Sequence, residues 1–109
     1  MANHSITITG ITNGHPVLSD NGKTYVDPSD TVTWIIGQNS GVSAITSIVD
    51  DVTTNVFDPN PAPIGNSTNW KGTINPSIAP GSEETYTINY TAGGTQHSFD
   101  PIIQVNPKM

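Results

Sequence analysis

The segment from Thr31 to Ile36 reads Thr-Val-Thr-Trp-Ile-Ile and decides the fold class of this chain. Threonine alternates here with larger apolar residues, so every second side chain can face a common core, as in a β-strand with one buried face. Similar alternation occurs in residues 5–9 (Ser-Ile-Thr-Ile-Thr) and 85–90 (Thr-Tyr-Thr-Ile-Asn-Tyr). We therefore predict three strands, with Trp34 in the core.

The remaining segments also favour strands over helices. Clusters of Gly, Asn, Asp and Pro interrupt the chain about every ten residues, which leaves segments too short for ordinary helices. Residues 99–105 are a predicted final strand, in which Pro101 requires an edge position, a bulge or a late start because it cannot donate a ladder hydrogen bond. Residues 42–49 lack clean alternation. They are predicted to form a strand covered on both faces, with a helical turn as an option near Asp50 and Asp51.

A long loop is expected from Asp58 to Gly72. Three prolines at alternate positions and a run of Asn, Ser and Thr make a regular element unfavourable there. Loops of this length in compact domains are usually functional or mobile. We expect this one to cross the outside of the molecule.

Together these elements predict an all-β fold in a single domain, residues 1–109. A chain of 109 residues has room for one core of ordinary size. Seven or eight short strands at this spacing are typical of a Greek-key β-sandwich.

Charge and cysteine content exclude several classes of partner. The formal net charge is −6, with three lysines and no arginine, so nucleic acid and anionic membrane surfaces are unfavourable partners. The chain has no cysteine, which excludes disulfides, thiolate metal sites and thiol nucleophiles. No apolar run approaches the roughly 20 residues that cross a bilayer, and no signal peptide is visible at the N-terminus. The uncharged Thr/Asn/Ser surface still favours a secreted or cell-surface protein of bacterial origin.

Two stretches resemble the cupredoxin family. The segment Asp27-Pro28-Ser29-Asp30 before residues 31–34 is similar to the Pro-Gly-Asp-x-Val-x-Trp strand of that family. Residues 78–82 (Ile-Ala-Pro-Gly-Ser) lead into an aromatic strand, a glycine-rich loop and a closing Ile-Ile-Gln-Val strand, in the order found in cupredoxins. The resemblance covers roughly residues 24 to 106, and it implies a cupredoxin-like Greek-key sandwich.

The copper ligands of that family are absent from this chain. Residues 38–43 (Gln-Asn-Ser-Gly-Val-Ser) stand where the resemblance implies the first histidine, and residues 91–97 hold one histidine and no cysteine. A type 1 copper site needs the thiolate. The resemblance therefore implies a scaffold without electron transfer, and we predict no cofactor and no metal.

Five residues are candidates for a binding site. Two loops meet at one end of a cupredoxin-like sandwich, and they contribute Gln38 and Asn39 from residues 37–43 and Gln96 and His97 from residues 91–97. Trp70 is a further candidate because an aromatic ring among Asn and Thr is typical of sugar-binding surfaces. The plainer interpretations are that His97 is an exposed histidine without a role and that Trp70 folds back to cover the open edge of the sandwich.

The leading hypothesis is a non-enzymatic extracellular binding or structural module. No nucleophile, acid and base set is visible at a recognisable spacing, so no catalytic residue is predicted. Its ligand is expected to be a small molecule, a glycan or a protein. The alternatives are a metal-binding protein that gathers its three histidines, a self-associating oligomer or fibre subunit with poorly protected edge strands, and a carbohydrate-binding module.

Overall fold

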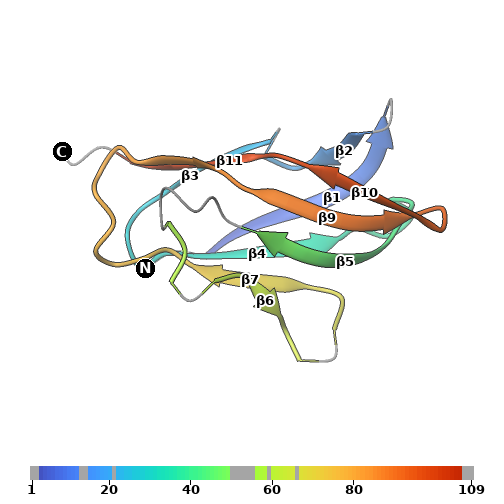
Figure 1. The fold of residues 1–109 in the computed structure, drawn as a ribbon, viewed down its shortest axis with the longest axis horizontal. Helices are drawn as coiled ribbons and strands as arrows, with labels where there is room; N and C mark the ends of the chain where they lie inside the picture. The colour runs from blue at the N-terminus through green and yellow to red at the C-terminus, as the bar shows by residue number, and fades with distance from the viewer. Residues whose placement is uncertain are drawn as a thin grey trace.

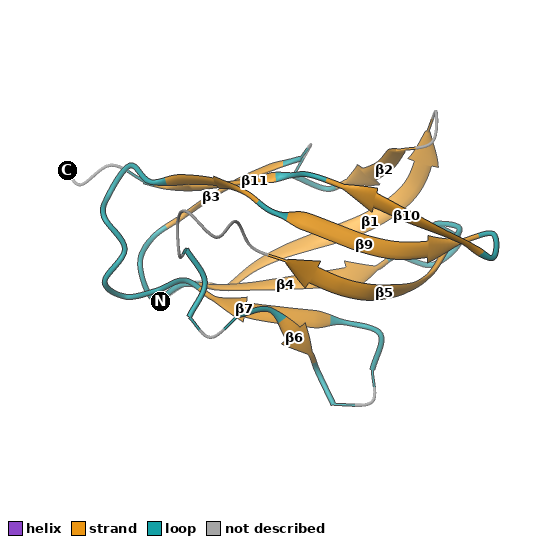
Figure 2. Cartoon of the chain, in the orientation of Figure 1, coloured by secondary structure: helices purple, strands orange, loops and turns teal. Residues whose placement is uncertain are grey.

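The computed structural model describes residues 3–12, 15–20, 22–49, 56–58, 60–65 and 67–106. Every regular element in these ranges is a β-strand (Figure 1; Figure 2). The strands are β1 (Asn3–Thr12), β2 (His15–Leu18), β3 (Lys23–Val26), β4 (Thr31–Ile36), β5 (Val42–Val49), β6 (Ala62–Pro63), β7 (Trp70–Thr73), β8 (Glu83–Thr85), β9 (Thr87–Ala92), β10 (Thr95–Phe99) and β11 (Ile102–Val105).

The strands form one five-stranded sheet and two three-stranded sheets. The five-stranded sheet has the order β2-β1-β4-β7-β6, and the smaller sheets have the orders β10-β9-β5 and β3-β11-β8. The smaller sheets share one long hairpin, because only Tyr86 separates β8 from β9 and only residues 100–101 separate β10 from β11. The Tyr86 N–H donates to the Pro101 carbonyl at 3.0 Å, so the two arms of the hairpin stay hydrogen-bonded to each other at this break.

The core lies between the five-stranded sheet and the shared hairpin, in a β-sandwich-like arrangement. Trp34 on β4 and Tyr86 are fully buried, and the Trp34 indole Nε1–H donates to the Tyr86 hydroxyl at 3.1 Å. Phe57 packs against both rings, with centroid distances of 5.7 and 5.9 Å. The predicted core position of Trp34 is confirmed. The buried indole N–H has a partner, as a buried polar group requires.

The all-β fold is as predicted, and the three alternating segments form strands. The described residues contain eleven strands, where seven or eight were predicted. The larger number arises because β6 has only two residues and because Tyr86 and residues 100–101 each divide a longer run into two strands. Pro101 lies in the second of these breaks, and β11 begins at Ile102, which is the late start that its missing N–H requires.

Two other segments differ from prediction. Residues 42–49 form β5, but its outer face is exposed rather than covered, and Val42, Ile45 and Ile48 are buried at every third position. Two register shifts against β9 explain this spacing, since a bulge changes the face on which the next residue lies. The predicted helical turn near residues 50–51 lies outside the described residues.

The second difference is in residues 58–72, which are not a continuous loop. β6 and the first three residues of β7 lie within them, and β7 pairs with β4 so that Trp70 lies opposite Trp34. This tertiary pairing with β4, which carries the buried Val32 and Trp34, outweighs the loop-like composition of the segment. In the described part of the chain there is also no helix of the length and apolarity that a bilayer would require.

Candidate binding surface

The turn between β4 and β5 is fixed by its backbone. The Gly37 N–H donates to the Ile8 carbonyl at 2.8 Å, and a Cβ at position 37 would stand 2.6 Å from that oxygen, so only glycine fits. Asn39 and Gly41 have positive φ angles of 61° and 88°, a region that asparagine and glycine tolerate best. The buried hydroxyl of Ser40 accepts from the Val42 N–H at 3.3 Å. The backbone of the turn is therefore fixed against β1, while the side chains of Gln38 and Asn39 at its tip are exposed to solvent.

A second turn, Gly93-Gly94, joins β9 to β10. Both glycines have positive φ, at 60° and 75°. This is the backbone of a type I′ hairpin, whose twist matches that of the two strands it joins. A Cβ at either position would have no neighbour within 4 Å, so the hairpin tip projects into solvent.

The two turns lie side by side at one end of the molecule (Figure 1). Val42 pairs with Ala92, and the Ser43 hydroxyl donates to the Thr91 carbonyl at 3.0 Å. The Gln96 side-chain amide adds a cross-strand bond to the Thr46 hydroxyl at 2.8 Å. We call residues 37–43 and 91–97 together the turn end.

The turn end carries no formal charge apart from its single histidine. Residues 37–43 and 91–97 contain no Asp, Glu, Lys or Arg. Gln38, Asn39, Gly93, Gly94 and Thr95 are exposed, so backbone amides and small polar side chains make up the tip. Such a surface can bind through hydrogen bonds and shape, and its binding should depend little on salt.

The structure brings four of the five predicted site residues to this end, although they face different ways. Gln38 and Asn39 point into solvent from the β4–β5 turn. Gln96 lies on the outer face of β10, whereas His97 faces inward and stacks on the Tyr90 ring at 5.4 Å with an interplanar angle of 22°. Their roles in binding stay predictions.

Trp70 belongs to a different surface. It begins β7 in the five-stranded sheet, where it is half-buried and packs against the core. This placement matches the alternative in which the ring folds back over the sandwich. A sugar-binding role for it stays a prediction.

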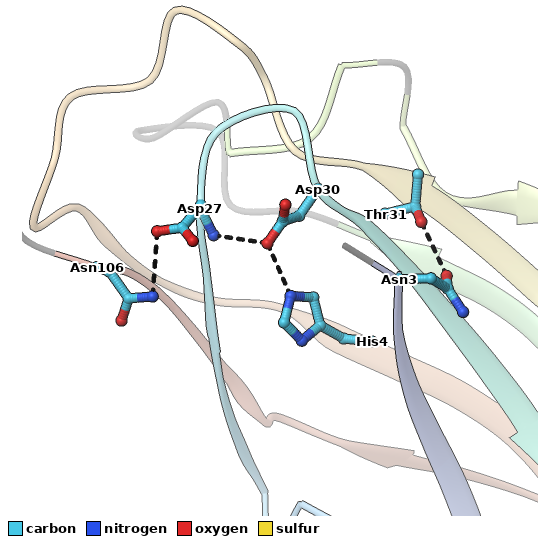
Figure 3. A network of polar contacts seen from close by, with 6 residues as sticks. All are labelled: Asn3, His4, Asp27, Asp30, Thr31 and Asn106. Atoms are coloured by element: carbon cyan, nitrogen blue, oxygen red, sulfur yellow. Dashed lines mark hydrogen bonds and ion pairs between the residues drawn. The ribbon is translucent and has the colours of Figure 1, made fainter. Parts of the chain in front are cut away.

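The opposite end of the molecule holds a network of polar side chains (Figure 3). The buried Asp30 carboxylate accepts from the His4 Nε2 atom at 2.8 Å and from the Asp27 N–H at 2.9 Å. The Asn106 side-chain amide donates to the Asp27 carboxylate at 3.2 Å, and the Thr31 hydroxyl donates to the Asn3 side-chain oxygen at 2.8 Å. The network joins the start of β1, the turn before β4 and the residue after β11. We call it the network end.

The histidines do not form a common centre. His4 lies at the network end, His15 lies 6.0 Å from the Phe99 ring, and His97 stacks on Tyr90. Among the described residues, no three His, Cys, Asp or Glu side chains are close enough together to hold a metal ion.

A further feature was missed by sequence reasoning. A surface pocket of about 250 Å³ lies between β2 and the end of β10. Its lining is Thr12, His15, Pro16, Val17, Leu18, Gly22 and Phe99. The only sequence signal was the short apolar run in residues 16–18, which does not reveal that Phe99 lies opposite it.

Comparison with known proteins gives a structural likeness only. No model of a protein family matches the sequence, and no curated protein matches it. Among solved structures, the chain is similar to the crystal structure of the cysteine protease inhibitor EhICP2 from Entamoeba histolytica. The TM-score is 0.50 at 12% identity, and the match covers 99% of this chain and 97% of that one. At this identity the likeness shows a shared all-β fold over the whole chain.

Proposed function

We propose that this chain is a non-enzymatic binding module that recognises a protein through the turn end. The proposal includes a cupredoxin-like topology without copper and a secreted or cell-surface location, both of which rest on sequence alone. The observation that carries it is the pair of adjacent, backbone-fixed turns with uncharged, exposed tips. Recognition loses less conformational entropy when the binding loops are already ordered.

The chemistry of the turn end favours a protein surface over a charged small ligand. Phosphate and carboxylate ligands are bound most strongly by lysine and arginine, and residues 37–43 and 91–97 contain neither. Exposed backbone amides with Gln, Asn and Thr side chains can instead pair with the peptide groups of another protein. Glycans remain the alternative ligand, since the same groups pair with hydroxyls.

The structural likeness supplies the first partner class to test. The similar solved structure is, by its title, a cysteine protease inhibitor, and that likeness extends over nearly the full length of both chains. A protein-binding role of this kind needs no catalytic residues.

The test is a titration of cysteine proteases with this chain, read as the rate of hydrolysis of a fluorogenic peptide. The Gln38→Arg and Thr95→Arg double variant places two bulky cations on the tips and should abolish inhibition. Thr68 is an exposed threonine in the β6–β7 connection, so Thr68→Arg is the control and should inhibit like the parent chain.

Two outcomes would contradict the proposal. Inhibition that survives the double variant would remove the turn end as the binding surface. If no protease is inhibited, a glycan array probed with the same variants decides between the protein and glycan alternatives. Binding of a glycan that the double variant abolishes would keep the surface and change the ligand.

A further inference from the structure

β10 is an edge strand without charged residues. It is the outermost strand in the order β10-β9-β5, and β9 is the only strand that pairs with it within the described ranges. Its sequence is Thr-Gln-His-Ser-Phe, so it has none of the lysines that commonly protect a sheet edge from pairing. β3 does not cover this edge, because β3 pairs with β11.

The ladder of β10 leaves some backbone groups facing outward. The two-residue hairpin is closed by the pair Ala92 and Thr95, and hydrogen-bonded pairs alternate along an antiparallel ladder. Thr95, His97 and Phe99 therefore bond to β9, while the N–H and C=O groups of Gln96 and Ser98 point away from it. These groups can bond to one more extended chain, and five residues of edge span about 17 Å.

The pocket described above lies beside this edge. Phe99 forms one wall, on the inner face of β10, and the apolar side of β2 forms the other. A volume of about 250 Å³ is sufficient for one large apolar side chain, since an apolar cavity of about 150 Å³ holds benzene. A residue placed opposite Phe99 on an added strand would project on the same face as Phe99, toward the pocket.

Charge indicates which extended chain would bind. The Asp20 carboxylate accepts from the N–H of Gly22 in the pocket wall, so one negative charge lies beside the pocket. No lysine lies on β10 or in the pocket lining. A second copy would bring another net charge of −6, which is repulsive, whereas a basic segment is attracted.

We propose that β10 binds an extended, basic peptide segment of a partner protein as an additional strand, with one apolar side chain of that segment in the pocket between Phe99 and β2. The backbone of β10 supplies affinity, and the pocket selects the side chain opposite Phe99. This site shares residues 95–97 with the turn end, but it uses the backbone edge and the pocket rather than the exposed tips at Gln38, Asn39 and the two glycines. It does not rest on the function proposed for those tips.

The probe is a capped peptide, Lys-Thr-Lys-Phe-Lys-Thr-Lys, which places its phenylalanine and threonines on one face and its lysines on the other. Ser98→Pro removes an outward N–H without touching the ladder to β9, a position where an edge strand tolerates proline. Val17→Asp fills the pocket with a carboxylate, which would strengthen attraction to the lysines if charge alone acted. Val49→Asp, on the exposed face of β5, is the matched control.

Binding is measured by fluorescence anisotropy and by amide shifts in ¹⁵N-labelled protein. We expect the amides of Gln96 and Ser98 to shift, and Ser98→Pro and Val17→Asp each to weaken binding about tenfold, the equivalent of one well-made interaction. Val49→Asp and the turn-end variant Gln38→Arg should bind like the parent chain. Retained affinity in Gln38→Arg separates this site from the proposed function.

Three results would overturn the proposal. The first is equal affinity of Ser98→Pro and the parent chain, and the second is equally tight binding of the same peptide with glutamates in place of lysines. The third is a concentration-dependent shift of the Gln96 and Ser98 amides without peptide, which would assign the edge to a second copy of the chain.

Discussion

The two ends of this sandwich are built by different kinds of interaction. At the network end, a buried carboxylate, Asp30, joins two segments through His4 and the Asp27 backbone. At the turn end, glycines and an asparagine with positive φ set the shape, and the side chains carry no carboxylate or ammonium group. One end is therefore held by side-chain electrostatics and the other by backbone conformation.

This difference indicates what each end can do. Groups in a satisfied buried network are already engaged, so they stabilise the fold and offer little to a ligand. A turn fixed by its backbone leaves its side chains free for contact, which is why rigid scaffolds often carry their binding residues on loops. The comparison predicts large stability effects at the network end and small ones at the tips of the turn end.

Asp30→Ala should have the largest effect. It removes the acceptor of two hydrogen bonds from a buried position, and we expect the free energy of unfolding to fall by about 3 kcal/mol. Urea denaturation measures this change. Asp100→Ala, which removes an exposed carboxylate bonded to Thr87, is the control and should cost less than about 1 kcal/mol. Equal costs for the two would erase the distinction between a buried network and ordinary surface polarity.

Gly37→Ala should have the next largest effect on stability and lower the free energy of unfolding by about 2 kcal/mol. The new methyl group would stand 2.6 Å from the Ile8 carbonyl oxygen, which is backbone and cannot turn aside. Gly93→Ala offers a comparison, because its Cβ would meet nothing within 4 Å and only its positive φ would be strained. Thermal unfolding of both variants measures the difference. If Gly37→Ala were the milder of the two, the β4–β5 turn would not be fixed against β1.

Tyr86→Phe tests the core between the two ends. The variant leaves the buried Trp34 indole N–H without its acceptor, and we expect the free energy of unfolding to fall by about 1.5 kcal/mol. Indole fluorescence during urea unfolding reports both the stability and the changed environment of Trp34. A variant as stable as the parent would show that another group satisfies the indole.

The burial of Tyr86 should also make the stability of the fold sensitive to alkaline pH. Burial raises the pKa of Tyr86, so its folded pKa lies above the unfolded value of about 10. Below pH 10 the Tyr86 hydroxyl is protonated in both the folded and the unfolded chain, and the full free energy of unfolding is retained. Above pH 10 the unfolded chain releases this proton while the folded chain keeps it, so the free energy of unfolding falls as the pH rises. The expected slope from this residue approaches 1.4 kcal/mol per pH unit. Tyr86→Phe should reduce the slope, and an unchanged slope would assign it to other groups.

Gln38→Arg and Thr95→Arg should have the smallest effects on stability. Both side chains are exposed at the tips of the turn end, and we expect changes within about 0.5 kcal/mol for each. Circular dichroism melting curves measure this. A larger loss would mean that these tips support the fold, and any loss of binding in the same variants would then need a different explanation.

Local pattern was sufficient to predict the strands but not their partners. Residues 31–36 and 85–90 alternate because each has one buried face, and a period of two is visible in sequence. The sequence of β5 lacks this period of two because two bulges shift its register against β9. Trp70 sits among loop-forming residues, and only its pairing with β4 makes it part of a strand.

The candidate surfaces were predicted unequally for the same reason. The two turns were identifiable from their glycines, and their proximity followed from the resemblance to a known sandwich. The pocket needs Phe99 to lie beside β2, which is about 80 positions earlier in the chain, and no local signal reports such a contact. The inward orientation of His97 likewise depends on its pairing with Tyr90.

The parallel pairing of β1 with β4 has a consequence for biosynthesis. β1 is synthesised before β4, yet it lies inside the five-stranded sheet, and its residue Asn3 pairs with Thr31. Until β4 has been synthesised, β1 can form only its hairpin with β2, which leaves the other backbone edge of β1 unpaired and open to other nascent chains. The five-stranded sheet cannot be completed before β4 has been synthesised, so the chain should fold slowly and gain from a chaperone that shields β1 and β2.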